Sequence, residues 1–231
     1  MSIKIFCDIA DINLIKNFNK KKIVKGFTTN PSLMRKAGAK NYEKYSKEIL
    51  RVCKKPISFE VFSDNFRSMK REALIINSWS KTVYVKIPVM NSKGIFMGKL
   101  IKELSQLNIK LNITAVYNSN QTKKILRCLR KNSRVIISIF AGRAADAGKD
   151  PIPEFEKSIK MAKKFKNVEI LWASVREPYN YIQAKQFGCH IITIPPKIIE
   201  KIEKFGKSFS QLSTETVKGF LKDSKRSKFK I

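Results

Sequence analysis

One lysine of this 231-residue chain lies where a charged side chain is out of place. Lys86 belongs to the run VYVKIPV, whose β-branched residues favour a buried strand. Burying an ammonium group is costly unless the group is paired or loses its proton, so Lys86 is a candidate amine nucleophile. Such an amine can form a Schiff base with a carbonyl substrate. The alternative is a structural ion pair with Glu60 or Asp8.

Two carboxylates lie near the ends of other apolar segments. Asp8 follows IKIFC, and Glu60 follows ISF. Aldol chemistry on a Schiff base needs one base at the C4 hydroxyl and a second acid or base that dehydrates the carbinolamine. Two separate carboxylates match that need. Either of them could instead neutralise Lys86 or cap a helix.

Two arginines and one asparagine complete the set of candidates. Arg143 and Arg176 follow later apolar segments, and a planar guanidinium can hold a phosphate through two hydrogen bonds. Surface salt bridges are the alternative for both. Asn30, in TTNPS, can reach a site or cap a short helix that begins at Pro31.

Eight short, β-branched segments predict the strands that position these residues. Amphipathic segments with helical spacing lie between them, for example 66–79, 95–107, 121–129, 153–165 and 179–187. One strand and one helix recur about every 29 residues, which predicts parallel strands covered by helices. The expected strands are 3–9, 23–28, 57–62, 82–89, 110–116, 134–140, 168–174 and 190–195.

The candidate residues lie near the same end of these strands, which favours a closed barrel over an open sheet. In a barrel, side chains at the carboxyl ends converge on one mouth. We therefore expect one α/β domain, a (β/α)8 TIM barrel with an additional C-terminal helix at 211–221, over residues 1–221. A basic, frayed tail is expected at 222–231. Pairs of residues two apart, and so on one strand face, are Thr28 and Asn30, Asn112 and Thr114, Ser138 and Phe140, and Ser174 and Arg176.

The charge balance favours an anionic partner. The chain carries 48 Lys and Arg against 18 Asp and Glu, a formal net charge of +30. Nucleic acid, a membrane surface or a phosphorylated metabolite would each fit such a charge. The basic residues are spread over every expected helix, without a zinc pattern or a compact basic and aromatic stripe. Nucleic-acid binding is therefore only a remote alternative.

Location and cofactors follow from what the sequence lacks. No apolar run reaches the roughly 18–20 residues that span a bilayer, and no secretion signal is recognisable, so we expect a cytoplasmic protein without membrane contact. The cysteines Cys7, Cys53, Cys128 and Cys189 are single, which predicts reduced thiols and no metal site. His190 follows Cys189 directly, and adjacent residues of a strand face opposite sides, so both are expected to pack. No motif calls for an organic cofactor.

Successive motifs of the chain resemble those of the transaldolases, and most closely the short group that includes the fructose-6-phosphate aldolases. They are GFTTNPSLMRKAG, SFEVF, VYVKIP, LNITAVYN, SIFAGRAADAG and ILWASVR followed by GCHIITIP, and they cover essentially the whole chain. The resemblance implies class I aldol chemistry on a (β/α)8 barrel. It makes Lys86 the Schiff-base lysine and Asp8 the base at the C4 hydroxyl.

The resemblance implies roles for the remaining candidates as well. Glu60 would act as acid and base through a water held by Thr114. The dihydroxyacetone hydroxyls would be bound by Asn30, Asn112 and Ser138. Thr28 and Ser174 would support the site. The phosphate would be held by Arg143 and Arg176.

Two positions favour transfer over simple cleavage. By resemblance, Glu60 stands where the fructose-6-phosphate aldolases have Gln, and Phe140 stands where they have Tyr. An apolar ring cannot protonate the enamine intermediate, which then survives until an acceptor aldehyde arrives. We therefore expect a transaldolase of the pentose phosphate route that moves dihydroxyacetone from sedoheptulose 7-phosphate or fructose 6-phosphate to an aldose phosphate.

Alternatives remain open at this point. The chain could be an aldolase that releases free dihydroxyacetone, or a transaldolase for another anionic sugar, such as one bearing a sulfonate. Short members of the family form pentamers or decamers, so the resemblance also implies a homo-oligomer. The expected partners are thus sugar phosphates and further copies of the chain.

Overall fold

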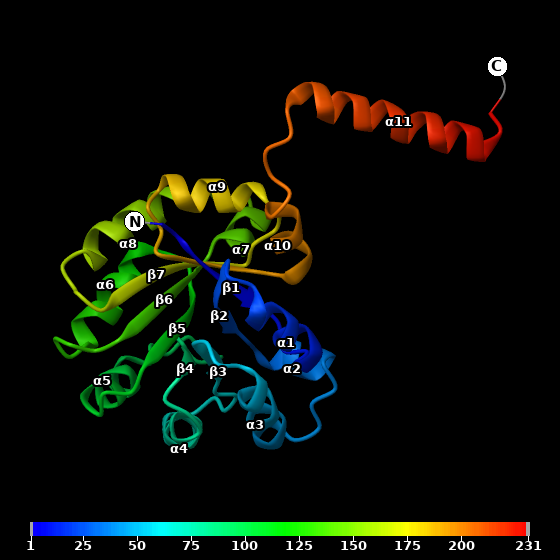
Figure 1. Ribbon diagram of the computed structural model, residues 1–231. Helices are drawn as coiled ribbons and strands as arrows, with labels where there is room; N and C mark the ends of the chain where they lie inside the picture. The colour runs from blue at the N-terminus through cyan, green and yellow to red at the C-terminus, as the bar shows by residue number, and fades with distance from the viewer. Residues whose placement is uncertain (1, 230–231) are drawn as a thin grey trace.

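Eight parallel strands form a closed barrel in the order of the chain (Figure 1). The computed structural model describes residues 2–229. The expected (β/α)8 barrel is confirmed, because each strand pairs in parallel with the next and β1 pairs with β8. The strands are β1 (Lys4–Asp8), β2 (Val24–Thr28), β3 (Ile57–Glu60), β4 (Val83–Pro88), β5 (Leu111–Val116), β6 (Val135–Phe140), β7 (Val168–Ala173) and β8 (Ile191–Ile194).

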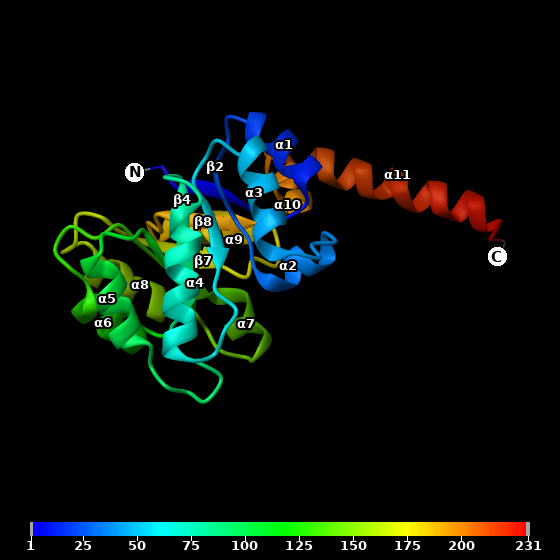
Figure 2. The ribbon, with the colours of Figure 1, turned by 90° about the horizontal axis from the view of Figure 1, so that it is seen from below.

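Helices connect the strands and cover the outside of the barrel (Figures 1 and 2). Short polar side chains start several of them: Asp11, Asn41 and Asn65 each accept a backbone N–H of the first turn. The helices are α1 (Ile12–Lys20), α2 (Pro31–Lys36), α3 (Tyr42–Val52), α4 (Phe66–Ser78), α5 (Gly98–Gln106), α6 (Ser119–Cys128), α7 (Ala141–Asp146), α8 (Ile152–Ala162), α9 (Tyr179–Gln186), α10 (Pro196–Ile202) and α11 (Phe209–Ser227).

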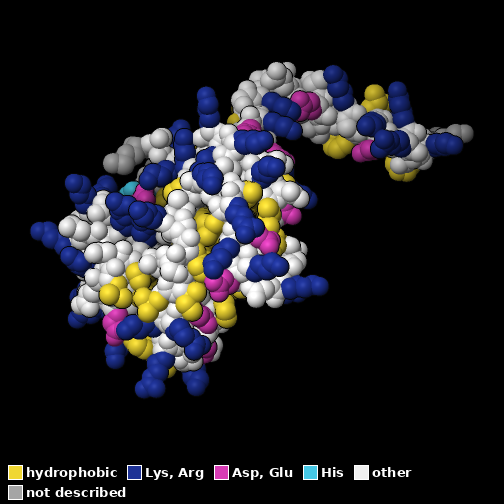
Figure 3. Space-filling view, turned by 60° about the horizontal axis from the view of Figure 1, so that its bottom comes forward, with side chains coloured by type: hydrophobic (Ala, Val, Ile, Leu, Met, Phe, Trp, Pro, Cys, Tyr) yellow, Lys and Arg dark blue, Asp and Glu magenta, His cyan; other side chains and the backbone are white. Residues whose placement is uncertain are grey.

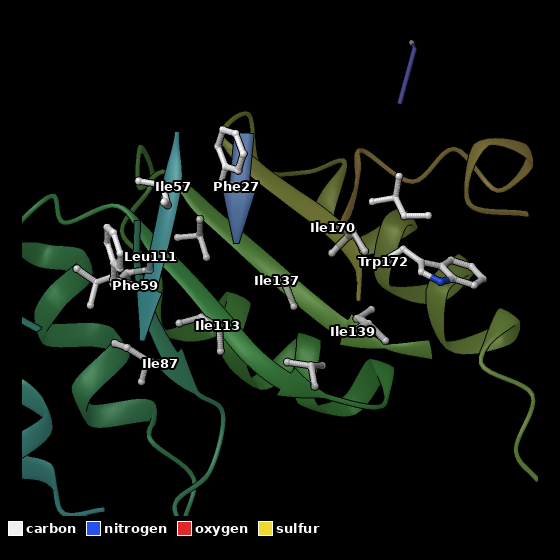
Figure 4. Packing of buried hydrophobic residues seen from close by; sticks show 14 of the residues in the cluster. Phe27, Ile57, Phe59, Ile87, Leu111, Ile113, Ile137, Ile139, Ile170 and Trp172 are labelled. Atoms are coloured by element: carbon white, nitrogen blue, oxygen red, sulfur yellow. The ribbon is translucent and has the colours of Figure 1, made fainter. Parts of the chain in front are cut away.

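The main core lies between the strands and the helices that cover them. Alternate strand residues point outward into this layer, for example Ile137 and Ile139 on β6 and Ile170 and Trp172 on β7 (Figure 4). Trp172 stacks on Phe155 of α8, with ring centroids 4.5 Å apart. Because both faces of these strands are covered, their sequences are almost continuously apolar.

A second, smaller apolar cluster fills the inside of the barrel. Four of its five members lie two residues before a polar or small residue of the same strand face. One member, the Phe6 ring, occupies the space where a side chain at Gly26 would lie, because a Cβ there would be 2.6 Å from Phe6 Cζ. The barrel is therefore closed toward the amino-terminal ends of its strands. The cluster consists of Phe6, Ile136, Leu171, Ala173 and Ile191, with Tyr84 and Phe140 packed against it.

The C-terminal helix α11 extends away from the barrel (Figures 1 and 2). A capping box between Ser208 and Gln211 starts it, and none of its residues is buried. The helix continues to Ser227, which corrects the expected boundary at Leu221 and the frayed tail from residue 222. Lys225 and Arg226 in the last turn favour this longer helix because they face the negative end of its dipole. Residues 230 and 231 of the expected tail lie outside the described part.

No helix within residues 2–229 combines the length and the apolar character needed to cross a membrane.

Candidate active site

A pocket of about 550 Å³ opens at the carboxyl ends of the strands. It contains eleven of the twelve residues that the sequence singled out, and only Asn112 is absent from its lining. The eleven are Asp8, Thr28, Asn30, Glu60, Lys86, Thr114, Ser138, Phe140, Arg143, Ser174 and Arg176.

Lys86 lies inside the barrel, level with Glu60 on β3 and Asn112 on β5. It is only 6% exposed. Its Nζ lies 3.0 Å from Glu60 Oε2 and donates to the backbone oxygen of Thr29, also at 3.0 Å. The lysine is thus paired with a carboxylate and also lines the pocket, so an amine and a proton acceptor meet at one point.

The end of strand β3 is held by a tyrosine. The Tyr42 hydroxyl of α3 donates to the backbone oxygen of Glu60 at 2.9 Å and accepts from its N–H at 3.0 Å. This double contact replaces the hydrogen bonds that the strand would otherwise need at its end. It fixes the backbone from which the Glu60 side chain reaches Lys86.

Asp8 ends strand β1 opposite Thr28 of β2. The Thr28 hydroxyl donates to Asp8 Oδ1 at 2.7 Å. Burial raises the pKa of Asp8, and the charge of Lys86 and the hydrogen bond from Thr28 oppose that rise only in part. Repulsion from Glu60 acts in the same direction as burial. A carboxyl with a raised pKa inside a pocket is suited to exchange protons with a bound molecule.

Two polar residues of β5 lie at different depths. Thr114 lines the pocket, is 2% exposed, and its hydroxyl makes no hydrogen bond within the described part of the chain. Asn112 lies beneath the lining, where its Nδ2 donates to Ser58 Oγ at 3.0 Å and its Oδ1 accepts from the Ser138 hydroxyl at 2.7 Å. Asn112 therefore orients Ser138, and its direct contact with a substrate stays a prediction.

Asn30 both caps a helix and lines the pocket. Its Oδ1 accepts from the Leu33 N–H at 2.9 Å, and α2 begins at Pro31, as the sequence suggested. The two interpretations of Asn30 are therefore compatible. The cap fixes the side chain at the pocket rim, and it also brings Ser32 and Lys36 of α2 into the lining.

The rim carries two exposed arginines. The Arg143 guanidinium lies 5.3 Å from the centroid of the Phe140 ring. Arg176 forms an ion pair with Asp146 through its Nε and Nη2, and this contact lowers the pKa of the Asp146 carboxyl. Two guanidinium groups at one rim, one of them held by a carboxylate, form a cationic patch that an anionic group of a substrate can contact.

Local backbone geometry brings these arginines together. Ser174, after β7, has a left-handed φ of 66°, which is unfavourable for a residue other than glycine. A Cβ at Gly142 of α7 would lie 1.8 Å from the backbone oxygen of Ser174. Only glycine lets α7, which carries Arg143, approach the end of β7, which leads to Arg176.

Sequence reasoning missed Thr193, which also lines the pocket. Its hydroxyl lies 2.5 Å from the Thr28 hydroxyl. Thr193 precedes Pro195 by two residues, so the strand periodicity that identified the other pairs would have found it. No strand pattern could have found Ser32 and Lys36, because they come from a helix.

The Cys189 and His190 pair lies elsewhere and packs, as expected. His190 Nδ1 accepts from the Ile170 N–H at 3.0 Å. Burial raises the pKa of Cys189 to about 12, so its sulfur stays a neutral thiol. Within residues 2–229, no group of three or more His, Cys, Asp or Glu side chains is arranged to hold a metal ion.

Comparison with known proteins agrees with this geometry. Residues 5–231 match the family model described as Transaldolase/Fructose-6-phosphate aldolase. The chain belongs to this family. The match covers the barrel from the second residue of β1 onward and includes every residue of the pocket, so the barrel and its mouth are those of a transaldolase/fructose-6-phosphate aldolase family member.

Curated relatives cover most of the chain. A probable transaldolase of Thermoanaerobacter sp. (strain X514) is 34% identical over 202 residues, which is 87% of this chain and 89% of the relative. One from Clostridium kluyveri is 34% identical over 95% of this chain and 96% of its own. One from Nitrosopumilus maritimus is 34% identical over 86% of each chain. The protein is therefore an enzyme with transaldolase-like aldol chemistry.

A solved structure supports the fold alone. Orotidine 5'-monophosphate decarboxylase from Metallosphaera sedula superimposes with a TM-score of 0.55 over 88% of this chain and 96% of its own. The two sequences are 11% identical. At that identity the likeness extends to the barrel and not to its chemistry.

Proposed function

We propose that this member of the family is a transaldolase that transfers a dihydroxyacetone unit from a ketose phosphate to an aldose phosphate. The donor would be sedoheptulose 7-phosphate or fructose 6-phosphate, and the carrier a Schiff base on Lys86. One observation carries the proposal: the buried Lys86 amine lines the pocket 3.0 Å from Glu60, with Asp8 in the same lining. An amine between two carboxylates supplies the nucleophile and both proton carriers of the reaction.

The first step joins the donor to the enzyme. Lys86 gives its ammonium proton to Glu60, and the free amine adds to the C2 carbonyl of the ketose. The resulting carbinolamine loses water when Glu60 returns a proton to its hydroxyl, through a water molecule bound at Thr114. The Thr114 hydroxyl, which has no hydrogen-bond partner among residues 2–229, supports this role. The product is a protonated Schiff base and one water molecule.

The second step breaks the C3–C4 bond. Asp8 takes the proton of the C4 hydroxyl, the new carbonyl forms at C4, and the electrons of the C3–C4 bond move toward the iminium nitrogen. An aldose phosphate leaves, and an enamine of dihydroxyacetone stays on Lys86. The raised pKa of Asp8 brings this carboxyl closer to the range in which it can both take and return a proton.

The third step reverses the chemistry with a new partner. The enamine carbon adds to the aldehyde of the acceptor, and Asp8 returns its proton to the aldehyde oxygen, which becomes the new hydroxyl. Water then hydrolyses the Schiff base and releases a ketose three carbons longer than the acceptor. Phe140 lines the pocket and has no proton to give, which favours addition to an aldehyde over protonation of the enamine.

Arg143 and Arg176 would hold the phosphate of both substrates at the rim. Their guanidinium groups are the exposed cationic forks of the lining, and Lys36 adds a third charge. A sulfonate has a similar shape and oxygen set, so a sulfo-sugar is the alternative donor. Competition between the two anionic sugars at equal concentration would separate these substrates.

Borohydride trapping tests the proposal. The protein is incubated with fructose 6-phosphate, reduced, digested and mapped by mass spectrometry. We expect a dihydroxyacetone adduct on Lys86 and none in Lys86→Arg, which keeps the charge beside Glu60. The control is Lys93→Arg, since Lys93 is an exposed lysine outside the pocket. A folded wild-type protein without an adduct would contradict the Schiff-base assignment.

A coupled assay then separates transfer from cleavage. Product formation that requires an aldose phosphate acceptor supports the transaldolase. Release of free dihydroxyacetone at the same rate without an acceptor would instead support the aldolase, which the description of the family also names.

We further propose that α11 docks onto a second copy of the chain, giving the pentamer or decamer that the family resemblance implies. No residue of α11 is buried, yet large apolar side chains are exposed along it. An amphipathic helix gains stability by burying such a face. The exposed apolar residues are Phe209, Leu212, Val217, Phe220 and Leu221.

Light scattering of the full chain tests this arrangement. Val217→Ser with Phe220→Ser should lower the measured mass to that of smaller assemblies. The matched control, Thr214→Ser on the same helix, should leave the mass unchanged. A monomeric wild-type protein would refute the role of α11.

With sugar phosphates as substrates, we propose that the enzyme works in the cytoplasm.

A further inference from the structure

Three side chains from neighbouring strands form a hydrogen-bonded chain at the pocket. Thr193 lies on β8, Asp8 on β1 and Thr28 on β2. Thr28 Oγ1 lies 2.7 Å from Asp8 Oδ1 and 2.5 Å from Thr193 Oγ1. Both threonines are buried, with 2% exposure at Thr28 and 6% at Thr193. The contacts are therefore shielded from bulk water.

The direction of this chain follows from counting hydrogens. A threonine hydroxyl has one hydrogen and two acceptor lone pairs. The Thr28 hydroxyl donates its one hydrogen to the Asp8 carboxylate, which can only accept hydrogen bonds while it is ionised. In the second contact Thr28 must therefore accept, and Thr193 must donate. Hydrogen bonds in such a series polarise one another, so the donor on β8 strengthens the bond to Asp8.

Few contacts favour the ionised form of the Asp8 carboxyl. The charged groups that affect it are Lys86 of β4, which favours the carboxylate, and Glu60 of β3, which opposes it. The neighbouring Cys7 is a buried thiol whose pKa is raised, so it adds no charge at neutral pH. Thr28 is then the one hydrogen-bond donor that reaches the carboxyl within the described part of the chain.

We propose that Thr193 is a positioning residue, which keeps the Thr28 hydroxyl hydrogen directed at the Asp8 carboxylate. This inference rests on the proposed function, in which Asp8 is the base at the C4 hydroxyl. Without the donor at Thr193, the Thr28 oxygen loses a buried partner, and its hydroxyl is free to rotate away from Asp8. The carboxylate then becomes harder to form and less well oriented for its proton transfer.

The experiment compares two substitutions in the full-length enzyme. Thr193→Val keeps the volume and removes the donor, whereas Thr193→Ser keeps the donor. For Thr193→Val we expect a roughly tenfold lower kcat and an acidic limb of the pH profile at higher pH. The total yield of borohydride adducts on Lys86, carrying either the uncleaved ketose or dihydroxyacetone, should not change, because Schiff-base formation does not use Asp8. Thr193→Ser should restore both kcat and the pH profile.

A double substitution shows whether Thr193 acts through Asp8. In an Asp8→Asn background, adding Thr193→Val should cost no further residual activity. A merely structural role would lower activity in both backgrounds and would leave the acidic limb in place.

Three results would overturn the inference: an unchanged kcat and pH profile in Thr193→Val, an equal loss in Thr193→Ser, or a further loss in the Asp8→Asn background. If Thr193→Val does not fold, Thr193→Cys replaces it as a variant of similar size with a weaker donor, and wild-type behaviour of that variant would overturn the inference. Absence of a Lys86 adduct in the wild type would refute the proposed function itself.

Discussion

Two carboxylates share one pocket but have different surroundings. Glu60 forms an ion pair with Lys86 at 3.0 Å, whereas Asp8 receives its hydrogen bond from Thr28. Burial dominates at Asp8 and raises its pKa. Environments that separate two carboxyls in this way assign them different tasks in acid–base chemistry. Proton exchange with Lys86 suits Glu60, and proton exchange with the substrate suits Asp8.

Replacing Asp8 by Asn should remove activity and increase stability at neutral pH. A carboxyl whose pKa is higher in the folded than in the unfolded state lowers stability as the pH rises from the unfolded value through the folded one. We therefore expect Asp8→Asn to unfold at a higher temperature than the wild type at pH 7, with a loss of at least about 100-fold in kcat. The difference in unfolding temperature should vanish toward about pH 4.

Calorimetry and the transfer assay measure the two effects on one sample. Asp11→Asn is the control, because Asp11 caps α1 outside the pocket and its amide analogue still accepts from Leu14. An Asp8→Asn variant that is less stable than the wild type at pH 7 would contradict the conclusion that burial of the Asp8 carboxylate outweighs its favourable contacts with Lys86 and Thr28.

Phe140→Tyr should shift the reaction from transfer toward cleavage. The ring lies in the pocket lining, so a hydroxyl added to it would bring a proton donor into the pocket that holds the proposed enamine. We expect the ratio of free dihydroxyacetone to transfer product to rise several-fold, measured with and without an acceptor aldehyde. An unchanged ratio would show that Phe140 does not protect the enamine.

At the scale of elements, the placement of several pocket residues depends on how a strand ends. Tyr42 of α3 holds the last residue of β3, and the left-handed Ser174 turns the chain after β7. The close approach of Gly142 to Ser174 joins α7 to that turn. A left-handed residue and a tight contact between a helix and a strand end thus lie beside the pocket.

The substitution Gly142→Ala tests the contact between α7 and the turn at Ser174. The added Cβ would meet the Ser174 backbone oxygen at 1.8 Å, so α7 must move and carry Arg143 with it. We expect a destabilisation of about 3 kcal/mol and a KM for phosphorylated substrates that rises more than kcat falls. Gly219→Ala is the control, since no atom lies within 4 Å of a Cβ there. Wild-type kinetics in Gly142→Ala would mean that the arginines do not depend on this contact.

The sequence predicts the strands well because their apolar, β-branched runs are covered on both faces. Expected strands such as 57–62 are longer than the observed Ile57–Glu60, because apolar character continues into the loop at Val61 and Phe62. The depth of Asn112 could not be predicted, since strand periodicity gives the face of a residue and not its level in the barrel. The length of α11 was missed because its apolar spacing ends before its helical turns do.

At the scale of the whole molecule, the positive charge is dispersed. Lys and Arg side chains are scattered over the visible face of the barrel and along α11 (Figure 3). No stripe of the kind that follows a nucleic-acid backbone stands out on that face. We expect the net charge of +30 to act instead as a general field that attracts small anions, including those that bind at the arginines of the mouth.

This field predicts a salt dependence. Raising the ionic strength from about 0.01 M to 0.5 M shortens the Debye length from roughly 30 Å to a few ångströms and removes long-range attraction. We expect kcat/KM for fructose 6-phosphate to fall several-fold, with little change in kcat. An uncharged acceptor such as glyceraldehyde is the control, because its kcat/KM should hardly respond. Equal responses of both substrates would contradict electrostatic steering.

The apolar cluster that closes the barrel below Lys86 has a consequence for the order of events. With Phe6 packed over Gly26, the donor, both aldehydes and the product must all use the mouth. In the proposed mechanism, the first aldose phosphate therefore has to leave before the second can enter. The kinetics should be ping-pong, with parallel lines in double-reciprocal plots, and excess acceptor should compete with the donor for the free enzyme. In the proposed mechanism the enamine on Lys86 is also shielded from below, so the acceptor should add to one face of it and every product should have the same configuration at C3.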